Sequence, residues 1–329
     1  MPMKNKVALE EHFAVEDTLI DSSVYFNEKT WPEKKTQLLD ILDQRLRRMD
    51  ASGIELSILS LNSPAIQARH NKNVAMDLAK RANDFIAEEI SRRPERFRAF
   101  AALPLQDPDA ATRELRRCVE ELGFVGALVN GYTQLGTEDS SLYYDQPQFR
   151  SFWQEVERLD VPFYLHPRLP LANQQRSTEG HPWLFGAAWQ FTVETATHAL
   201  RLMGAGIFDE FPKLTVVLGH LGEMLPVIIW RVSHWASACG KNPDPAPAKK
   251  SFVDYLRQNF FVTTSGNFRT MSMRNAMEEM GAGRVLFSTD YPFEDMEEAA
   301  KWFDAAEISD SDREAIGRDN ARRLFKLDK

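Results

Sequence analysis

The stretch KVALEEHF, residues 6–13, opens with a short apolar strand and ends on Glu10, Glu11, His12 and Phe13. Seven more apolar runs follow along the chain, at residues 55–61, 97–103, 124–130, 161–166, 214–220, 260–265 and 284–289. Stretches with the apolar period of a helix lie between them, most clearly at residues 36–53, 74–93, 109–123 and 311–327. Eight strands alternating with helices indicate parallel pairing through right-handed crossovers. The sequence therefore predicts an α/β fold, a (β/α)8 TIM barrel with loop insertions.

The chain shows no linker and no change of composition that would divide it. One barrel domain, residues 1–329, is therefore expected. A doubly wound open sheet is the alternative architecture, but no GxGxxG motif follows the first strand. Residues 14–36 and 169–186 are the long irregular segments, and loops of that length often carry function.

Composition and charge argue against several classes of protein. The formal net charge of −8 disfavours binding to nucleic acid or to an anionic membrane surface. Two cysteines, Cys118 and Cys239, are too few for a disulfide framework or a thiolate metal cluster. No apolar run approaches the roughly 18 residues that span a membrane, and the first residues do not resemble a signal peptide. A cytoplasmic protein is expected.

Polar side chains gather at the carboxyl ends of the predicted strands, where barrels of this type carry out their chemistry. They are Glu10 and His12 on the first strand, Asn130 on the fourth, His166 on the fifth, His220 on the sixth and Asp290 after the eighth. Because side chains alternate along a strand, Glu10 and His12 are expected to point the same way, toward the barrel axis. Glu11 is then expected to point toward the helix layer.

Four of these side chains, Glu10, His12, His166 and Asp290, would converge on one point from three strands. Mixed imidazole and carboxylate ligands suit Zn²⁺, Mn²⁺ or Fe²⁺ better than Mg²⁺ or Ca²⁺. A buried carboxylate without a partner is unfavourable, which favours a metal site over unrelated residues. Taken singly, Asp290 can also cap a helix. A structural ion pair is expected at Glu11. No phosphate loop, nucleophile elbow or cofactor fingerprint is present, so no organic cofactor is expected.

Four motifs together resemble the amidohydrolase superfamily: ExH at 10–12, HPR at 166–168, GHLGE at 219–223 and FSTDYPFE at 287–294. Within it, the chain is similar to the metal-dependent decarboxylases of hydroxylated aromatic acids. The segments KVALEEHFA, FAALPLQDPDAA, GFVGALVNG, LDVPFYLHPR and FVTTSGNFRT look most like the branch that acts on 2,6-dihydroxybenzoate. The resemblance implies reversible, non-oxidative loss of CO₂ to give resorcinol. It also implies one divalent metal, Mn²⁺ or Zn²⁺, since Glu10 replaces a His and Asn130 stands where a bridging Lys would be needed.

The resemblance further implies roles for residues around the metal. Asp290 would donate the proton from beside the metal, and His220 would hydrogen-bond the substrate or shuttle the proton. Glu223 would orient His220. Contacts with the substrate are expected from Tyr25, Asn130, Arg231 and Phe293.

A further segment, MLPVIIWRVSHW at residues 224–235, is apolar nearly all round. A helix on the outer ring of a barrel normally shows water a polar face, so this one suggests a covering subunit. The resemblance implies a homodimer or homotetramer in which Arg231 reaches the neighbouring active site. A surface ion pair is the alternative interpretation of Arg231.

Two other classes of function stay open. The same metal and Asp290 as a base would suit a hydrolase of a lactone or cyclic amide. A binding or scaffold protein without catalysis is the other class. Among decarboxylases, 2,3-dihydroxybenzoate and salicylate are alternative substrates.

Overall fold

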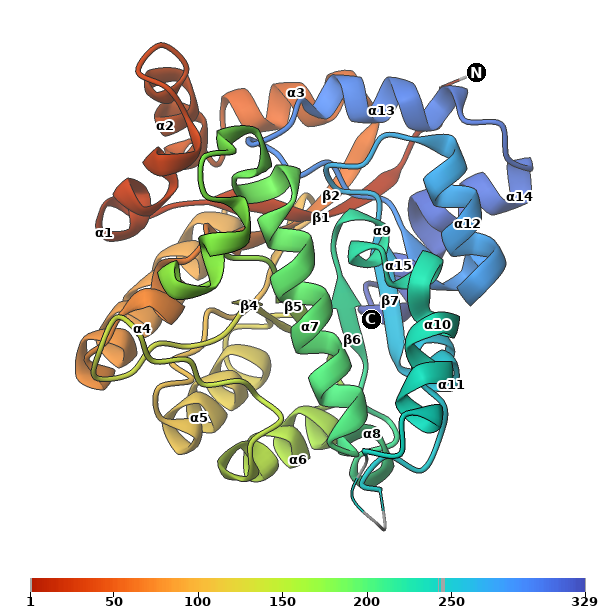
Figure 1. Cartoon of the computed structure of the whole chain (residues 1–329). Coiled ribbons are helices and arrows are strands. Elements are labelled where there is room, and N and C mark those ends of the chain that lie inside the picture. The colour runs from red at the N-terminus through yellow and green to blue at the C-terminus, as the bar shows by residue number, and fades with distance from the viewer. Residues whose placement is uncertain (1, 242, 244–245, 329) are drawn as a thin grey trace.

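Parallel strands form the centre of the molecule, with helices around them (Figure 1). The computed structural model describes residues 2–241, 243 and 246–328, and eight strands lie within them. They are β1 (Lys6–Phe13), β2 (Ile54–Leu61), β3 (Phe97–Ala99), β4 (Ala127–Asn130), β5 (Phe163–His166), β6 (Val216–Leu218), β7 (Phe260–Thr263) and β8 (Val285–Leu286). Neighbours in the orders β1-β2-β3 and β4-β5-β6-β7-β8 all pair in parallel. The predicted α/β fold with eight parallel strands is confirmed.

The helices connect successive strands and cover their outer faces (Figure 1). Those after β1 and β2 are α1 (Glu16–Leu19), α2 (Trp31–Leu39), α3 (Gln44–Ser52) and α4 (Lys72–Ser91). Those from β3 to β6 are α5 (Pro108–Glu120), α6 (Arg150–Leu159), α7 (Gln190–Gly204) and α8 (Ile207–Glu210). Those after β6 are α9 (His220–Glu223), α10 (Leu225–Ala238), α11 (Phe252–Asn259), α12 (Thr270–Met280), α13 (Met296–Ala305), α14 (Asp310–Glu314) and α15 (Asn320–Leu324). Among the described residues, none of these helices is long and apolar enough to cross a membrane.

Alternate strand residues fill the inside of the barrel and pack against the end of the chain. The inner cluster comprises Val7, Leu9, Leu56, Ile58, Phe100, Leu128, Tyr164, Val217, Phe261 and Leu286, together with Ala321, Phe325 and Leu327. The rings of Phe100 and Phe325 meet edge to face with centroids 5.5 Å apart. Figure 1 accordingly shows the C-terminus close to the strands. This end of the barrel is thus filled with apolar side chains, which leaves the carboxyl ends of the strands for chemistry.

Side-chain hydrogen bonds and a single β-bridge join the edges of the two sheets, where regular strand pairing stops. A parallel bridge between Ala101 and Ala127 links the β3 segment to β4. On the other side, the Glu11 carboxylate accepts hydrogen bonds from Thr289 N at 2.9 Å, Thr289 Oγ1 at 2.6 Å and Ser288 Oγ at 3.1 Å. No ion pair in the described part of the chain includes Glu11. The expectation of an ion pair was therefore wrong, and hydrogen bonds hold this carboxylate between β1 and the segment after β8.

Two predicted helices are interrupted, each for a local reason. The predicted helix 36–53 divides at Asp40, whose carboxylate accepts a hydrogen bond from Arg45 N at 2.7 Å and so competes with helical bonding. The predicted helix 311–327 contains a π-helical turn at Ala315–Asp319. Gly317 in that turn lies so close to Met3 that an added Cβ would approach its sulfur to 2.4 Å. This close contact with the first residues of the chain is long-range packing, which a local periodicity does not reveal.

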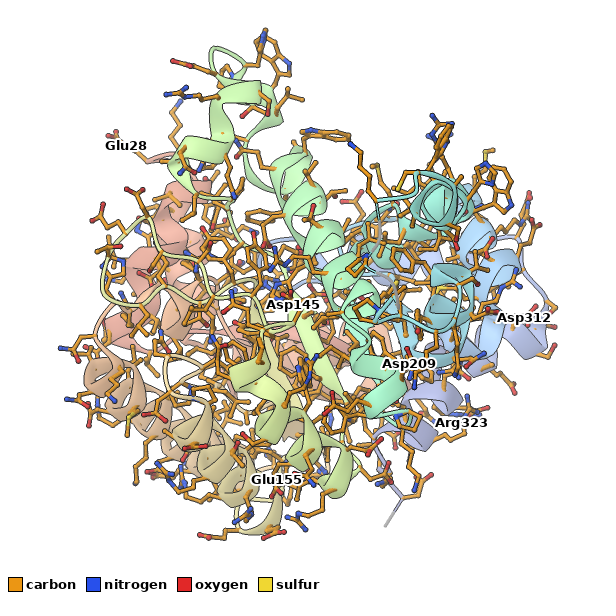
Figure 2. The ribbon with its side chains drawn as sticks, turned by 60° about the horizontal axis from the view of Figure 1, so that its bottom comes forward. Glu28, Asp145, Glu155, Asp209, Asp312 and Arg323 are labelled. Atoms are coloured by element: carbon orange, nitrogen blue, oxygen red, sulfur yellow. The ribbon has the colours of Figure 1, made fainter. Side chains whose placement is uncertain are left out.

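The outer surface carries charged side chains that also tie neighbouring connections together. Figure 2 labels several of them, including Asp145 on the connection that leads from β4 to α6. Asp145 binds the guanidinium of Arg201 on α7 through both oxygens, at 2.9 and 3.0 Å.

The two irregular segments predicted at 14–36 and 169–186 contain α1, α2 and short 3-10 turns such as Ile20–Tyr25.

Candidate metal centre and pocket

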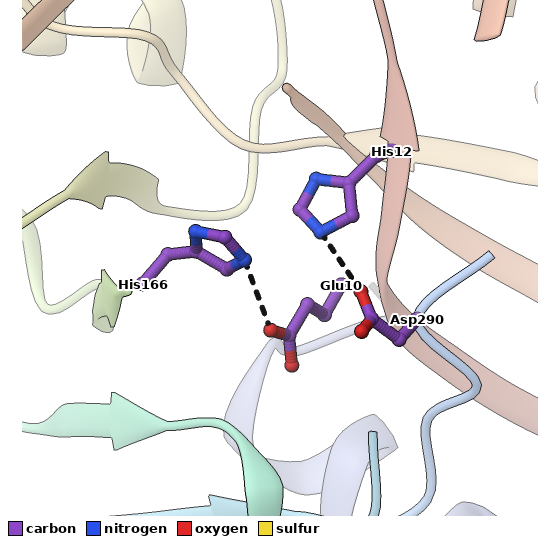
Figure 3. A group of neighbouring side chains, drawn as sticks. All are labelled: Glu10, His12, His166 and Asp290. Atoms are coloured by element: carbon purple, nitrogen blue, oxygen red, sulfur yellow. Dashed lines mark ion pairs between the residues drawn. The ribbon is translucent and has the colours of Figure 1, made fainter. Parts of the chain in front are cut away.

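Four side chains meet at the carboxyl ends of the strands, as Figure 3 shows. Glu10, His12, His166 and Asp290 each offer one ligand atom, and these atoms all lie within 4.8 Å of one another. His12 Nε2 lies 3.3 Å from Asp290 Oδ1, and His166 Nε2 lies 3.3 Å from Glu10 Oε1. The side chains of Glu10 and His12 are fully buried, and that of Asp290 is 13% exposed. The structure therefore brings together the four residues predicted as metal ligands.

A bulge in β1 turns Glu10 and His12 into the barrel. Val7 and Leu9 already fill the interior, so strict alternation would bring Glu11 inward and leave Glu10 outside. The pairing with β2 shifts register between Leu9 and Glu11, and Glu10 adopts a φ of 71°. The extra residue reverses the alternation from that point onward. Glu10 and His12 do share a direction as predicted, but the bulge produces it.

The donor set fits a divalent cation. Glu10 Oε1 and His12 Nε2 are buried atoms that have no hydrogen-bond partner among the described residues. Burial lowers the pKa of His12, although Asp290 opposes the effect, and a neutral imidazole is the form that ligates metals. Two carboxylates and two imidazoles suit Mn²⁺ or Zn²⁺. A cation bound here would satisfy both buried atoms and balance the two carboxylates.

Beside this cluster lies a second group of polar residues, centred on His220. The histidine follows β6 in a left-handed turn with a φ of 52°. Its Nδ1 lies 2.6 Å from Glu223 Oε1, and Thr192 Oγ1 on α7 donates a 2.7 Å hydrogen bond to Glu223 Oε2. Its Nε2 faces the metal cluster, 3.7 Å from Asp290 Oδ2 and 3.8 Å from Glu10 Oε1. The predicted pairing of Glu223 with His220 is present in the structure.

The charges of His220 and Asp290 follow from their surroundings. Burial lowers the pKa of His220, but the Glu223 and Glu10 carboxylates outweigh it and raise the pKa well above its ordinary value. Burial raises the pKa of Asp290, but the neighbouring imidazoles of His12 and His220 outweigh it and bring the pKa well below its ordinary value. These surroundings favour the protonated form of His220 and the carboxylate form of Asp290 beside it.

An aromatic pocket of about 230 Å³ opens above these groups. His166, His220 and Asp290 contribute its polar lining, and the segment after β8 contributes Phe293. The loop after β1 supplies Tyr25, which meets the ring of Phe293 edge to face with centroids 6.5 Å apart. The other aromatic residues of the lining are Phe26, Phe185 and Phe191. A planar aromatic acid suits such walls, with its carboxylate toward the polar lining.

Two residues predicted to contact the substrate lie elsewhere in this chain. Asn130 is buried, and its amide nitrogen donates hydrogen bonds to Asn62 O at 3.1 Å and Pro64 O at 3.4 Å. It is not among the residues that line the aromatic pocket, and it ties the end of β4 to the segment after β2. Arg231 is exposed on α10 and does not line the pocket of its own chain either.

Sequence reasoning missed the hydroxyl groups around Glu10. Inside the barrel, Glu10 Oε2 accepts hydrogen bonds from the side-chain hydroxyls of Tyr164, Thr263 and Ser265. The alternation in FYLH and in FFVTTS places each of them on the same face as a ligand or an inner apolar residue. That signal was available, but hydroxyl groups are common at strand ends and did not stand out beside histidines and carboxylates.

Comparison with known proteins agrees with this geometry. A family model described as Amidohydrolase matches residues 12–327. The gamma-resorcylate decarboxylase of Rhizobium radiobacter is 59% identical over 326 residues, which cover 99% of both chains. A crystal structure of 2,6-dihydroxybenzoate decarboxylase complexed with 2,6-dihydroxybenzoate matches with a TM-score of 0.96 and 58% identity, over 98% of this chain and 100% of that one.

A second solved structure adds a metal to the comparison. The dihydroxybenzoic acid decarboxylase of Polaromonas sp. JS666, with bound manganese and the inhibitor 2-nitroresorcinol, matches with a TM-score of 0.96 and 54% identity. The match covers 99% of this chain and 98% of that one. The family match spans nearly the whole chain, and the relatives exceed half identity over their full lengths. The chain therefore belongs to the amidohydrolase family and, within it, to the gamma-resorcylate decarboxylases.

Proposed function

We propose that this chain decarboxylates 2,6-dihydroxybenzoate (gamma-resorcylate) without oxidation, giving resorcinol and CO₂, and that the reaction is reversible. The observation that carries the proposal is the cluster Glu10, His12, His166 and Asp290 at the polar side of an aromatic pocket. The Rhizobium radiobacter relative and the solved structure complexed with 2,6-dihydroxybenzoate are decarboxylases of this acid by name, which supports the same substrate.

One divalent cation is proposed at the cluster, with Mn²⁺ first and Zn²⁺ as the alternative. Manganese is preferred because it is bound in the matching Polaromonas structure. Glu10, His12, His166 and Asp290 would hold the cation. When bound, it supplies positive charge that attracts and orients the anionic oxygens of the substrate.

The chemical step requires a proton at the ring carbon that bears the carboxylate. As this proton arrives, the bond to the carboxylate carbon breaks, CO₂ leaves and a C–H bond takes its place. An ortho hydroxyl is needed because it supplies electron density to the ring carbon that is protonated. A proton held at His220 reaches the substrate through Asp290, whose Oδ2 lies 3.7 Å from His220 Nε2. Such acid–base groups typically contribute about 10²- to 10⁴-fold in rate.

The remaining residues position these groups and the substrate. Glu223 and Thr192 fix the ring of His220, as their 2.6 and 2.7 Å contacts indicate. Phe293 and Tyr25 form walls against which a flat ring packs. An apolar wall also favours release of neutral CO₂ over retention of a charged carboxylate.

Substrate selectivity tests this proposal. Protein loaded with Mn²⁺ is incubated with 2,6-dihydroxybenzoate, 2,3-dihydroxybenzoate, salicylate and benzoate, and CO₂ and phenolic product are measured together. We expect equal amounts of resorcinol and CO₂ from 2,6-dihydroxybenzoate and no turnover of benzoate, which has no ortho hydroxyl. Comparable rates on benzoate, or hydrolysis of a lactone without loss of CO₂, would contradict the proposal.

A further inference from the structure

The two carboxylate oxygens of Glu10 have different surroundings. Oε2 accepts hydrogen bonds from the hydroxyls of Tyr164 and Ser265 and, at 3.1 Å, from that of Thr263. Oε1 has no hydrogen-bond partner among the described residues and lies 3.3 Å from His166 Nε2. We call Tyr164, Thr263 and Ser265 the hydroxyl cluster. It occupies one oxygen of Glu10 and leaves the other facing the candidate metal ligands.

The hydroxyl cluster is itself held in place. Thr263 Oγ1 lies 3.0 Å from Tyr164 Oη and 2.7 Å from Ser265 Oγ, so the three hydroxyl oxygens pack against one another around Oε2. Ser265 Oγ also accepts a 3.3 Å hydrogen bond from the backbone N–H of His220, which leaves its own proton free for Glu10. Tyr164, Thr263 and Ser265 are fully buried, so water does not compete for these bonds. Their positions come from β5 and from β7 with the residues just after it.

The backbone near β6 leaves the free oxygen accessible. Gly219 lies against Glu10 so closely that an added Cβ would stand 2.9 Å from Oε1 and 3.0 Å from Oε2. Glycine here allows the carboxylate to sit at the end of β6 with no side chain in front of Oε1. The geometry thus restrains one oxygen and keeps the other open.

We propose that the hydroxyl cluster is a positioning device that limits Glu10 to ligation through Oε1 alone. With one atom from each of four residues, an ion that accepts about six ligands keeps positions free for a chelating substrate. The inference rests on the metal centre of the proposed function and assigns a task to three residues outside the ligand set. A group that hydrogen-bonds a metal ligand typically changes metal affinity about 10- to 100-fold when it is removed.

Metal affinity measured by calorimetry tests the positioning role, because a merely structural role would change unfolding but not the dissociation constant of a folded protein. The variants are Tyr164→Phe, Thr263→Val and Ser265→Ala, each prepared free of metal and titrated with Mn²⁺. We expect the dissociation constant to rise about 10-fold or more in each, and KM for 2,6-dihydroxybenzoate at saturating Mn²⁺ to rise as well. Thr263→Ser keeps the hydroxyl and is expected to restore native affinity.

Tyr144→Phe is the matched control, because Tyr144 is also fully buried and its hydroxyl bonds Thr133 at 2.8 Å, away from Glu10. It is expected to bind Mn²⁺ as the native protein does. Native affinity in the three test variants would overturn the inference. If Tyr164→Phe does not fold, the Thr263→Val and Thr263→Ser pair decides the question alone. Failure of the native protein to bind Mn²⁺ would instead refute the metal centre of the proposed function.

Discussion

His220 and Asp290 face one another at the polar side of the pocket, and different neighbours set their charges. The carboxylates of Glu223 and Glu10 stabilise the protonated form of His220, and the imidazoles of His12 and His220 stabilise the carboxylate form of Asp290. In this pair, His220 is therefore the proton donor and Asp290 is the proton acceptor. Only Asp290 belongs to the candidate ligand set, so the two residues are separable by mutation.

Replacing His220 by Ala is expected to lower kcat at least ~100-fold, because it removes the stored proton. Asp290→Asn is expected to lower kcat to a similar extent, because it removes the carboxylate between His220 and the substrate. Bound metal is measured alongside turnover, and His220→Ala should retain it. His70→Ala, in the loop before α4, is the control and should behave as the native protein does. Near-native turnover of His220→Ala with metal bound would contradict the proton route.

Glu194 on α7 is a buried carboxyl outside the metal centre. It is 3% exposed, and neither of its oxygens has a hydrogen-bond partner in the part of the chain that the structure describes. Burial raises its pKa to about 8, although the charge of Arg168 opposes this. The folded state therefore retains a proton that the unfolded chain releases near its ordinary value of 4.5.

Glu194 is accordingly expected to reduce stability as the pH rises from about 4.5 to about 8. The folded state binds more protons than the unfolded state in this window, so the free energy of unfolding falls. One pKa unit corresponds to about 1.4 kcal/mol. The free energy of unfolding of Glu194→Gln should therefore exceed that of the native protein by up to a few kcal/mol more at pH 8 than at pH 5. Urea unfolding at pH 5 and pH 8 measures the difference. A difference that does not change with pH would refute the raised pKa.

At the scale of elements, alternation of apolar runs and helical periods was enough to predict eight parallel strands and the helices between them. The ends of the strands were less predictable than their number and order. The run 284–289 forms strand only at Val285–Leu286, and the run 214–220 only at Val216–Leu218. The residues beyond leave the sheet because their backbone turns toward the site, where His220 and Asp290 both adopt positive φ. Such conformations depend on tertiary contacts, which local pattern does not contain.

The candidate ligands were predictable because residue type and strand position together limited the choice. The bulge at Glu10 was not predictable, because nothing in the sequence EEH at residues 10–12 shows which of these residues is the extra one in the strand. Strand position alone does not tell a substrate contact from a bond to the neighbouring backbone, so the contact of Asn130 with the substrate stays a prediction. Phe185 was missed because the loop that carries it has no periodic pattern, and Phe191 was missed because it stands at the start of α7, whose first residues follow that loop. What the sequence lacked was the position of each loop over the barrel.

The turn between β6 and α9 offers a prediction at this scale. Gly219 has φ −71° and ψ −179°, values that alanine adopts without strain. Gly219→Ala should therefore leave the turn intact but press a methyl group against Glu10, and it should weaken Mn²⁺ binding about 10-fold or more. Gly204→Ala, where an added Cβ meets only Phe252 at 3.5 Å, is the matched control. Equal Mn²⁺ affinity in Gly219→Ala and Gly204→Ala would show that the close approach has no effect.

At the scale of the whole molecule, the outer face of α10 stands out by its exposed apolar side chains. On α10, Val227 is 70% exposed, Trp230 68% and Trp235 53%, while Leu225 and Ile229 are buried. Large apolar patches of this kind usually mark interfaces between proteins. We infer that this face meets a second copy of the chain in a dimer or tetramer, with Arg231 directed at the neighbouring active site.

Disrupting this face is expected to dissociate the assembly. Val227→Glu places a charge in the middle of the apolar surface and should give monomers by light scattering. Val74→Glu, at a side chain that is 52% exposed on α4, is the control and should not change the mass. Arg231→Ala should raise KM for the substrate without loss of metal. A native monomer that is fully active at the concentration of the assay would contradict the shared site.

The most direct test of the central claim is a titration of metal-free protein with Mn²⁺ while the conversion of 2,6-dihydroxybenzoate to resorcinol is followed. Glu10, His12, His166 and Asp290 form one cluster in each chain, so turnover should rise in proportion to added metal and level off at one equivalent. Elemental analysis of the active protein should give the same ratio. Full turnover in verified metal-free protein, or a plateau only at two equivalents per chain, would contradict decarboxylation at a single metal centre.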